Sequence, residues 1–228
     1  MKNIYVDPSW GHLLLVEGSD DEIFFKKFTQ HLKIDADIHI VQYGGKTKLR
    51  SFLLTILNDT DYPRNRKHIG IVRDSDRNTN AFDSVLSALE YANKNRGTDH
   101  KFSIPPAAQT RSVESPYVSV LTLPPDEQGT LEDVVMDALK ADPIMPCVES
   151  YFDCLTPLMT NISEERKSKS RLSVFVSGKV IDMDETSNRD SKRKFLREAV
   201  AMNWWKPELW RHSKFKPIED FLRQLLKP

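Results

Sequence analysis

Cysteine is scarce in this chain of 228 residues, since Cys147 and Cys154 are the only two. Their spacing suits neither a CxxC metal knuckle nor the disulfide framework of a small secreted domain, so we expect two reduced, buried thiols. Long apolar runs are lacking as well, because no stretch of about 18 apolar residues occurs and residues 1–10 lack the apolar core of a signal peptide. These absences predict a cytoplasmic protein without a membrane segment.

An excess of charge of one sign is also lacking, because 33 basic side chains balance 33 acidic ones. This balance excludes a bulk polycation, and any binding of nucleic acid must therefore come from a local basic face. Basic residues cluster at 64–67, 166–171 and 189–194. These clusters are either solvated faces balanced by nearby acids or the flanks of a nucleic-acid site.

Strand and helix patterns alternate through the first half of the chain. Short apolar runs at 12–16, 37–43, 68–74 and 117–123 predict buried strands, and the intervening segments carry apolar residues at helical spacing. In the first helix these residues are Ile23, Phe24, Phe28 and Leu32, with Ser19 or Asp20 placed to cap its start. The alternation predicts an α/β fold with a mainly parallel sheet flanked by helices.

The pattern changes near residue 125. Beyond Pro124 and Pro125 strand signals mostly vanish and helical patterns dominate, apart from a polar, acidic stretch at 180–189 that predicts a mobile loop. We therefore expect an α/β catalytic domain over residues 1–125. A mostly helical C-terminal subdomain, residues 126–228, is expected to pack on it.

Carboxylates follow two of the predicted strands directly. Glu17 comes after the first strand with Asp21 four residues later, and Asp74 and Asp76 come after the third. In an open α/β sheet ligands bind at the carboxyl ends of the strands, so the two acidic clusters are expected to converge there. Their mutual repulsion is tolerable mainly when a divalent cation lies among them, and oxygen ligands favour Mg²⁺ or Mn²⁺ over zinc. The alternative is that each acid merely caps a helix or loop.

These motifs resemble the Toprim domain, the metal-binding catalytic module of topoisomerases, primases and overcoming-lysogenization-defect (OLD) nucleases. The resemblance rests on VEGSDD after the first strand, the GG turn after the second and RDSD after the third. It implies a Toprim-like, Rossmann-like core. The segment TLEDVVMDAL is similar to the acidic helix that follows this core in OLD-like and small stand-alone Toprim proteins, which puts Glu132 and Asp133 forward as a second metal site.

The resemblance also implies roles for individual residues. Glu17, Asp21, Asp74 and Asp76 would hold a first Mg²⁺ or Mn²⁺, and Glu132 or Asp133 would hold a second ion, giving one or two ions per site. Glu17 serves either as a ligand or as a general acid or base. The residues expected to act in catalysis are Glu17, Asp74, Asp76 and Lys169. The residues expected to contact nucleic acid are Lys46, Lys167, Lys169, Arg171 and Arg193.

Several other sequence motifs do not indicate a functional site. GGKT at 44–47 ends like a P-loop, but Ile40 stands where the first glycine is required. The GG pair is explained by turn geometry, and the alternative is that its amides or Lys46 contact a phosphate. The six histidines lack zinc-ligand spacing. The tryptophans near the C-terminus, Trp204, Trp205 and Trp210, either stack on unpaired bases or complete the core.

Together these observations predict a divalent-metal-dependent nuclease that hydrolyses or nicks nucleic acid, DNA rather than RNA, in prokaryotic phage defence or DNA metabolism. One alternative is a Toprim regulatory or effector subunit that works with a separate ATPase in trans, because OLD nucleases resemble this domain and carry an ATPase that the chain lacks. A second is a hydrolase or transferase of small phosphoesters. Cleavage mode, specificity and oligomeric state stay open.

Overall fold

The structure, a computed structural model, describes residues 11–59, 67–75, 80–125, 128–158, 164–181 and 207–227. Its centre is a four-stranded sheet in the order β2-β1-β3-β4. The strands are β1 (His12–Val16), β2 (Ile38–Gln42), β3 (His68–Asp74) and β4 (Tyr117–Leu123). All three neighbouring pairs are parallel, so the carboxyl ends of the strands meet at one edge. The predicted parallel α/β sheet is confirmed.

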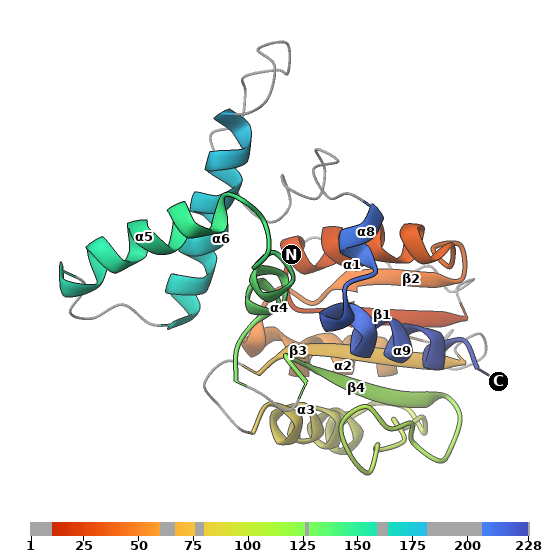
Figure 1. The fold of residues 1–228 in the computed structure, drawn as a ribbon. Coiled ribbons are helices and arrows are strands. Elements are labelled where there is room, and N and C mark those ends of the chain that lie inside the picture. Colours follow the sequence, from red (N-terminus) through yellow and green to blue (C-terminus); the bar gives the residue numbers. More distant parts are fainter. Residues whose placement is uncertain are drawn as a thin grey trace.

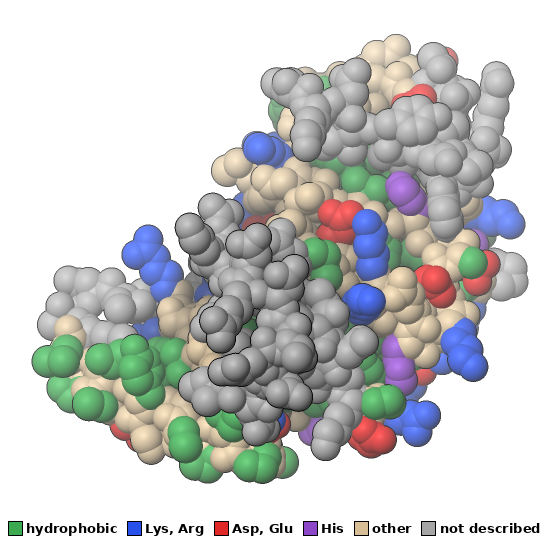
Figure 2. All heavy atoms as spheres, turned by 90° about the horizontal axis from the view of Figure 1, so that it is seen from above, with side chains coloured by type: hydrophobic (Ala, Val, Ile, Leu, Met, Phe, Trp, Pro, Cys, Tyr) green, Lys and Arg blue, Asp and Glu red, His purple; other side chains and the backbone are tan. Residues whose placement is uncertain are grey.

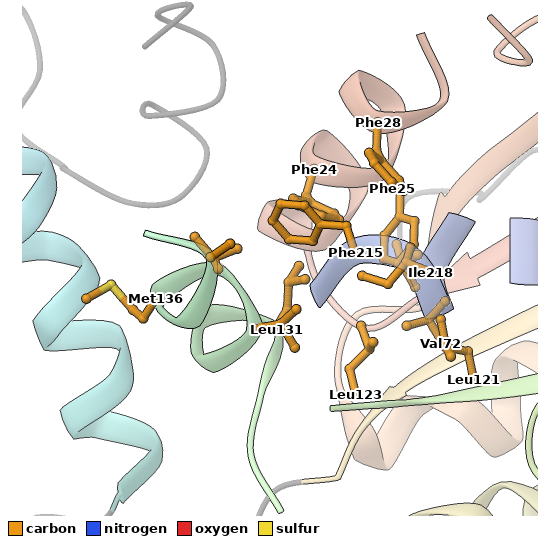
Figure 3. Packing of buried hydrophobic residues seen from close by; sticks show 14 of the residues in the cluster. Phe24, Phe25, Phe28, Val72, Leu121, Leu123, Leu131, Met136, Phe215 and Ile218 are labelled. Carbon is orange, nitrogen blue, oxygen red and sulfur yellow. The ribbon is translucent and has the colours of Figure 1, made fainter. Parts of the chain in front are cut away.

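Helices cover both faces of the sheet (Figure 1), and an apolar core lies on each face. Leu13 and Leu15 of β1 point into one core with α2 (Leu49–Leu57) and α3 (Ala81–Asn95), and Leu14 and Val16 point into the other. This alternation follows from the two-residue period of a strand, and it explains why β1 is apolar throughout. The second core includes Phe24, Phe25 and Phe28 of α1 (Ser19–Leu32), which lie against Phe215 and Ile218 (Figure 3).

The second half of the described chain is mostly helical. It contains α4 (Leu131–Ala138), α5 (Met145–Leu155), α6 (Glu164–Ile181), α8 (Pro207–Trp210) and α9 (Lys216–Leu225), with the short 3₁₀ turns η2 (Thr156–Leu158) and η3 (Ser213–Phe215). A further 3₁₀ turn, η1 (Lys46–Lys48), precedes α2 in the first half. Helix α9 lies across the sheet in Figure 1 and contacts β3 and β4. Its close approach depends on Gly70, where a Cβ atom would lie 2.9 Å from Leu225 Cδ1.

Helices α4, α5 and α6 lie beyond the opposite end of the sheet from the C-terminus (Figure 1). Residues before and after position 125 share one apolar core, for example Leu14 with Val135 and Phe221. The two-domain division at residue 125 stays a prediction. None of the described helices is long and apolar enough to cross a membrane.

Two local predictions are wrong. Neither Ser19 nor Asp20 caps α1: the N-cap is Gly18, whose amide donates to Asp21 Oδ2 at 2.8 Å. The two cysteines are free, as expected, but both are exposed rather than buried. They lie on α5, which buries Met145, Val148 and Phe152 instead. Apolar side chains gather at the end of the molecule formed by α5 (Figure 2). Tyr151 of α5 and Leu158 of η2 are exposed.

The other C-terminal predictions are tested in part. Helix α6 continues to Ile181, and the remainder of the predicted loop, 182–189, lies outside the described residues. The same holds for Trp204 and Trp205. Trp210 packs against Phe28 and Phe215, with ring centroids 5.5 and 6.3 Å away, which confirms its core role.

Burial of His68 predicts an acid-sensitive contribution to stability. Its Nε2 lies 2.8 Å from Ser119 Oγ, and burial, aided by the charge of Arg111, lowers the pKa of His68 to about 4. The folded state therefore keeps the ring neutral while the unfolded chain protonates it near pH 6.5, so this stability is present above pH 6.5 and is lost as the pH falls toward 4. Relative to His68→Gln, wild type should lose roughly 1 kcal/mol or more between about pH 7 and 4.5 in urea unfolding. A pH-independent difference between the two proteins would contradict this assignment.

Candidate functional site

A cavity of about 490 Å³ opens at the carboxyl ends of β1, β2 and β3. Five of its lining residues are acidic, and α6 contributes a lysine, a leucine and a serine. The lining residues are Glu17, Gly18, Ser19, Asp20, Asp21, Gln42, Gly44, Gly45, Asp74, Glu132, Lys169, Leu172 and Ser173. Glu17, Asp21 and Asp74, which follow the first and third strands, therefore line one cavity. Asp76 lies outside the described residues.

Glu17 is held at the end of β1 by two elements. Its Oε2 accepts a hydrogen bond from Arg73 Nη1 at 2.9 Å, which also makes an ion pair. Its backbone carbonyl accepts from the amides of Gly44 and Gly45 at 3.1 and 2.9 Å. Both glycines have positive φ, 84° and 103°, which a residue with a side chain rarely adopts. Because these amides bind Glu17, they are not available to cradle a phosphate.

Asp21 and Glu132 form the buried part of the acidic wall. Burial, together with the charges of Glu132, Glu17 and Asp20, raises the pKa of Asp21 to about 7, against the hydrogen bond from Gly18. Burial likewise raises the pKa of Glu132, which the nearby cation of Lys169 opposes. Glu132 is 8% exposed. The two carboxyls thus carry an electrostatic cost that a bound cation would relieve.

The start of α4 connects β3 to this wall. Asp74 Oδ1 accepts from the Leu131 amide at 3.1 Å, so the carboxylate at the end of β3 binds the N-terminus of α4 and brings Glu132 to the cavity. Asp133 is occupied differently: its Oδ2 accepts from the Thr130 amide at 2.8 Å and its Oδ1 accepts from the Ser168 hydroxyl. The contact with Thr130 is that of a helix cap, and the contact with Ser168 joins α4 to α6. A metal role for Asp133 stays a prediction with no geometric support.

The basic residues that were predicted to contact nucleic acid do not share one location. Lys169 lines the cavity from α6, whereas Arg171 pairs with Glu149 at 3.4 Å and lies over the Phe152 ring at 5.4 Å. Arg171 lines a second cavity, about 530 Å³, between α4, α5 and α6. Lys46 lies on η1 and Lys167 on α6, both outside the lining of the acidic cavity. Arg193 lies outside the described residues.

The donor chemistry of the cavity fits a hard divalent cation. Five carboxylates, those of Glu17, Asp20, Asp21, Asp74 and Glu132, supply oxygen only, which suits Mg²⁺ or Mn²⁺. Among the described residues, no three acidic, histidine or cysteine side chains already converge as a ready-made metal site. A cation would therefore have to draw the carboxylates together.

Sequence reasoning missed Arg73 and Gln42. Arg73 precedes Asp74 in a strand that is otherwise apolar at its centre, and it is 8% exposed. A charged residue inside a buried strand is a recognisable signal, because a buried charge needs a partner. Gln42 ends the edge strand β2, and nothing in the sequence distinguishes its side chain from that of an ordinary strand-end residue.

Comparison with known sequences identifies the family. Residues 11–227 match the profile of the family described as "Protein of unknown function (DUF3226)", a match that spans most of the chain, and the chain therefore belongs to this family. No curated protein matches the sequence.

Three solved structures are similar to the chain. Two are of the C-terminal region of the Xanthomonas campestris pv. campestris OLD protein, at 13% and 14% identity and TM-scores of 0.41 and 0.39, covering 94% and 95% of this chain and 98% and 94% of theirs. The third is the C-terminal region of the Burkholderia pseudomallei OLD protein, at 12% identity and a TM-score of 0.36, covering 94% and 88%. Similarities this low do not establish a shared function.

Burial of Asp21, together with repulsion from the neighbouring acids, predicts how this residue affects stability. Because its pKa is raised from 3.8 to about 7, the stability associated with the protonated carboxyl is present at low pH and is lost as the pH rises through 7. Asp21→Asn removes the charge and keeps an oxygen that can accept from Gly18. In EDTA the variant should gain roughly 1 kcal/mol or more over wild type between about pH 5 and 8, measured by urea unfolding. If the free energies of unfolding of the two proteins differ by the same amount across this range, the pKa of Asp21 is not raised in the folded protein.

Proposed function

We propose that the chain is a Toprim-type, divalent-metal-dependent nuclease that hydrolyses phosphodiester bonds of nucleic acid in the acidic cavity. The observation that carries the proposal is the cavity itself, whose lining includes Glu17, Asp21, Asp74, Glu132 and Lys169. A group of carboxylates suits a cation, and a lysine in the same cavity suits a phosphate that the cation would bind.

The chemistry of the substrate agrees with this arrangement. A phosphodiester resists attack by water because it is anionic, and further negative charge develops on the attacking and leaving oxygens in the transition state. A bound Mg²⁺ or Mn²⁺ would neutralise this charge and lower the pKa of a coordinated water. Glu17, Asp21, Asp74 and Glu132 would hold one or two such ions, and Lys169 would orient the scissile phosphate.

The motif pattern supports the class of enzyme. A glutamate after the first strand and an Asp-x-Asp pair after the third resemble the Toprim signature, and the described part of that signature, Glu17 and Asp74, lines one cavity. The chain's neutral net charge limits nucleic-acid contacts to local basic groups, for which Lys169, Lys167, Lys46 and Arg193 are the candidates. DNA is the preferred substrate in this proposal, and an ATPase in trans is its candidate protein partner.

Plasmid nicking tests the proposal. Purified wild type should convert supercoiled plasmid to nicked or linear forms with Mn²⁺ or Mg²⁺ and not with EDTA. Asp74→Asn should lower the rate about 100-fold or more, because it removes a cation ligand but keeps an oxygen able to accept from the Leu131 amide. Asp76→Ala should have a similar effect.

The matched control for these variants is Asp35→Asn, which changes an exposed carboxylate in the turn after α1 and should cut like wild type. Cleavage that survives EDTA, or that survives Asp74→Asn and Asp76→Ala, would overturn the assigned site. Binding of Mn²⁺ with no cleavage of DNA or RNA would instead favour a small phosphoester substrate or a missing ATPase partner.

Lys169 should contribute a single phosphate contact. Lys169→Gln is expected to weaken binding of a DNA duplex and to reduce the slope of log K against log salt by about 1, measured by fluorescence anisotropy in Ca²⁺. Lys94→Gln, which changes an exposed lysine in the last turn of α3, away from the cavity lining, is the control and should leave the slope unchanged. An unchanged slope for Lys169→Gln would contradict the phosphate contact and would leave Lys169 the role of offsetting the charge of Glu132.

A further inference from the structure

Arg73 is an unusual residue for the interior of a sheet. It lies on β3, its side chain is 9% exposed, and its Nη1 donates to Glu17 Oε2 at 2.9 Å. Its Nε is buried and has no hydrogen-bond partner. A buried polar group without a partner costs free energy, so the position of this guanidinium is not explained by its own hydrogen bonding alone.

The surroundings of Arg73 lock it in place. Its neighbours Ile71 and Ile69, two and four residues earlier on the same face of β3, belong to the core with α2 and α3, as does Tyr43. Tyr43 is 1% exposed, and its hydroxyl donates to the Val72 carbonyl at 3.1 Å. Burial raises the pKa of Tyr43 and the charge of Glu17 adds to this, while Arg73 opposes it by its charge and by a hydrogen bond. Arg73 therefore reaches Glu17 from a rigid, packed layer.

Stability does not account for this pair. Replacing a buried ion pair by apolar groups of similar volume is often neutral or stabilising, because desolvation offsets the attraction between the charges. The partner of Arg73 is Glu17, a lining residue of the acidic cavity, whose side chain is 18% exposed. A charged residue that is packed on one side and bound to a site carboxylate on the other is placed to fix the orientation of that carboxylate.

We propose that Arg73 is a positioning residue: it holds the Glu17 carboxylate at the mouth of the acidic cavity in the orientation that binds the divalent cation. Arg73 does not contact the cation or the substrate. It places Glu17 before a cation arrives, and it supplies a permanent positive charge that allows Glu17 to lie near Asp21 and Asp74 in the cation-free protein. This role rests on the cation site of the proposed function, and it does not require that the substrate be a nucleic acid.

Calorimetric titration with Mn²⁺ tests the proposal through a double-mutant cycle of Arg73→Lys and Glu17→Gln. Lysine keeps the positive charge but loses the planar guanidinium that reaches both Glu17 and Tyr43. Arg73→Lys should raise the Mn²⁺ dissociation constant about fivefold or more, and Glu17→Gln about tenfold or more. In the Glu17→Gln background, Arg73→Lys should change it by less than about twofold, since the carboxylate that Arg73 positions is gone.

Three results would overturn the proposal: an Mn²⁺ affinity of Arg73→Lys equal to that of wild type, the same loss in both backgrounds, or unchanged affinity in Glu17→Gln. A merely structural role of Arg73 would give the second result. If Arg73→Lys does not fold, as judged by circular dichroism and urea unfolding, Tyr43→Phe replaces it in the cycle, with a loss of about twofold or more expected only when Glu17 is present. Absence of plasmid cleavage, by contrast, would count against the nuclease and leave this Mn²⁺ result standing.

Discussion

Repulsion between carboxylates at one edge of the sheet is the constraint on which the rest of the structure depends. Parallel strands end together, so Glu17 and Asp74 lie at the same edge, and the first turns of α1 and α4 add Asp21 and Glu132. Positive partial charge at helix N-termini favours acids there, but only partly offsets the repulsion. Burial raises the pKa of Asp21 and of Glu132, and the charges of neighbouring carboxylates add to both shifts.

The protein limits this cost from two sides. Arg73 neutralises Glu17 from within the core, and Lys169 lowers the pKa of Glu132 from α6. Backbone amides also hold two of the acidic residues in position, since the amides of Gly44 and Gly45 bind the Glu17 carbonyl and the amide of Leu131 binds the Asp74 carboxylate. Carboxylates with the side chains of Arg73 and Lys169 beside them are a setting in which a divalent ion gains binding energy and a phosphate finds a positive partner.

The sheet and the positions of Glu17, Asp21 and Asp74 were predictable because they depend on local patterns. Apolar runs such as HLLLV fix the strands, parallel order follows from alternating helices, and an acid directly after a strand must lie at the carboxyl edge. Glu132 was predicted only through the Toprim resemblance, because its approach depends on the long-range bond between Asp74 and Leu131. The contact of Arg73 with Glu17 joins residues 56 apart, and no local period encodes it. The exposed cysteines were mispredicted because composition does not say which face of α5 is buried.

The central claim is that the acidic cavity binds a divalent cation, because the proposed chemistry and the role of Arg73 both depend on it. Crystals grown with Mn²⁺ and measured at a wavelength near the manganese absorption edge test it most directly. An anomalous difference peak between Glu17, Asp21, Asp74 and Glu132 is the predicted result. Crystals in which these carboxylates surround only solvent at millimolar Mn²⁺, or in which manganese binds elsewhere, would contradict the account.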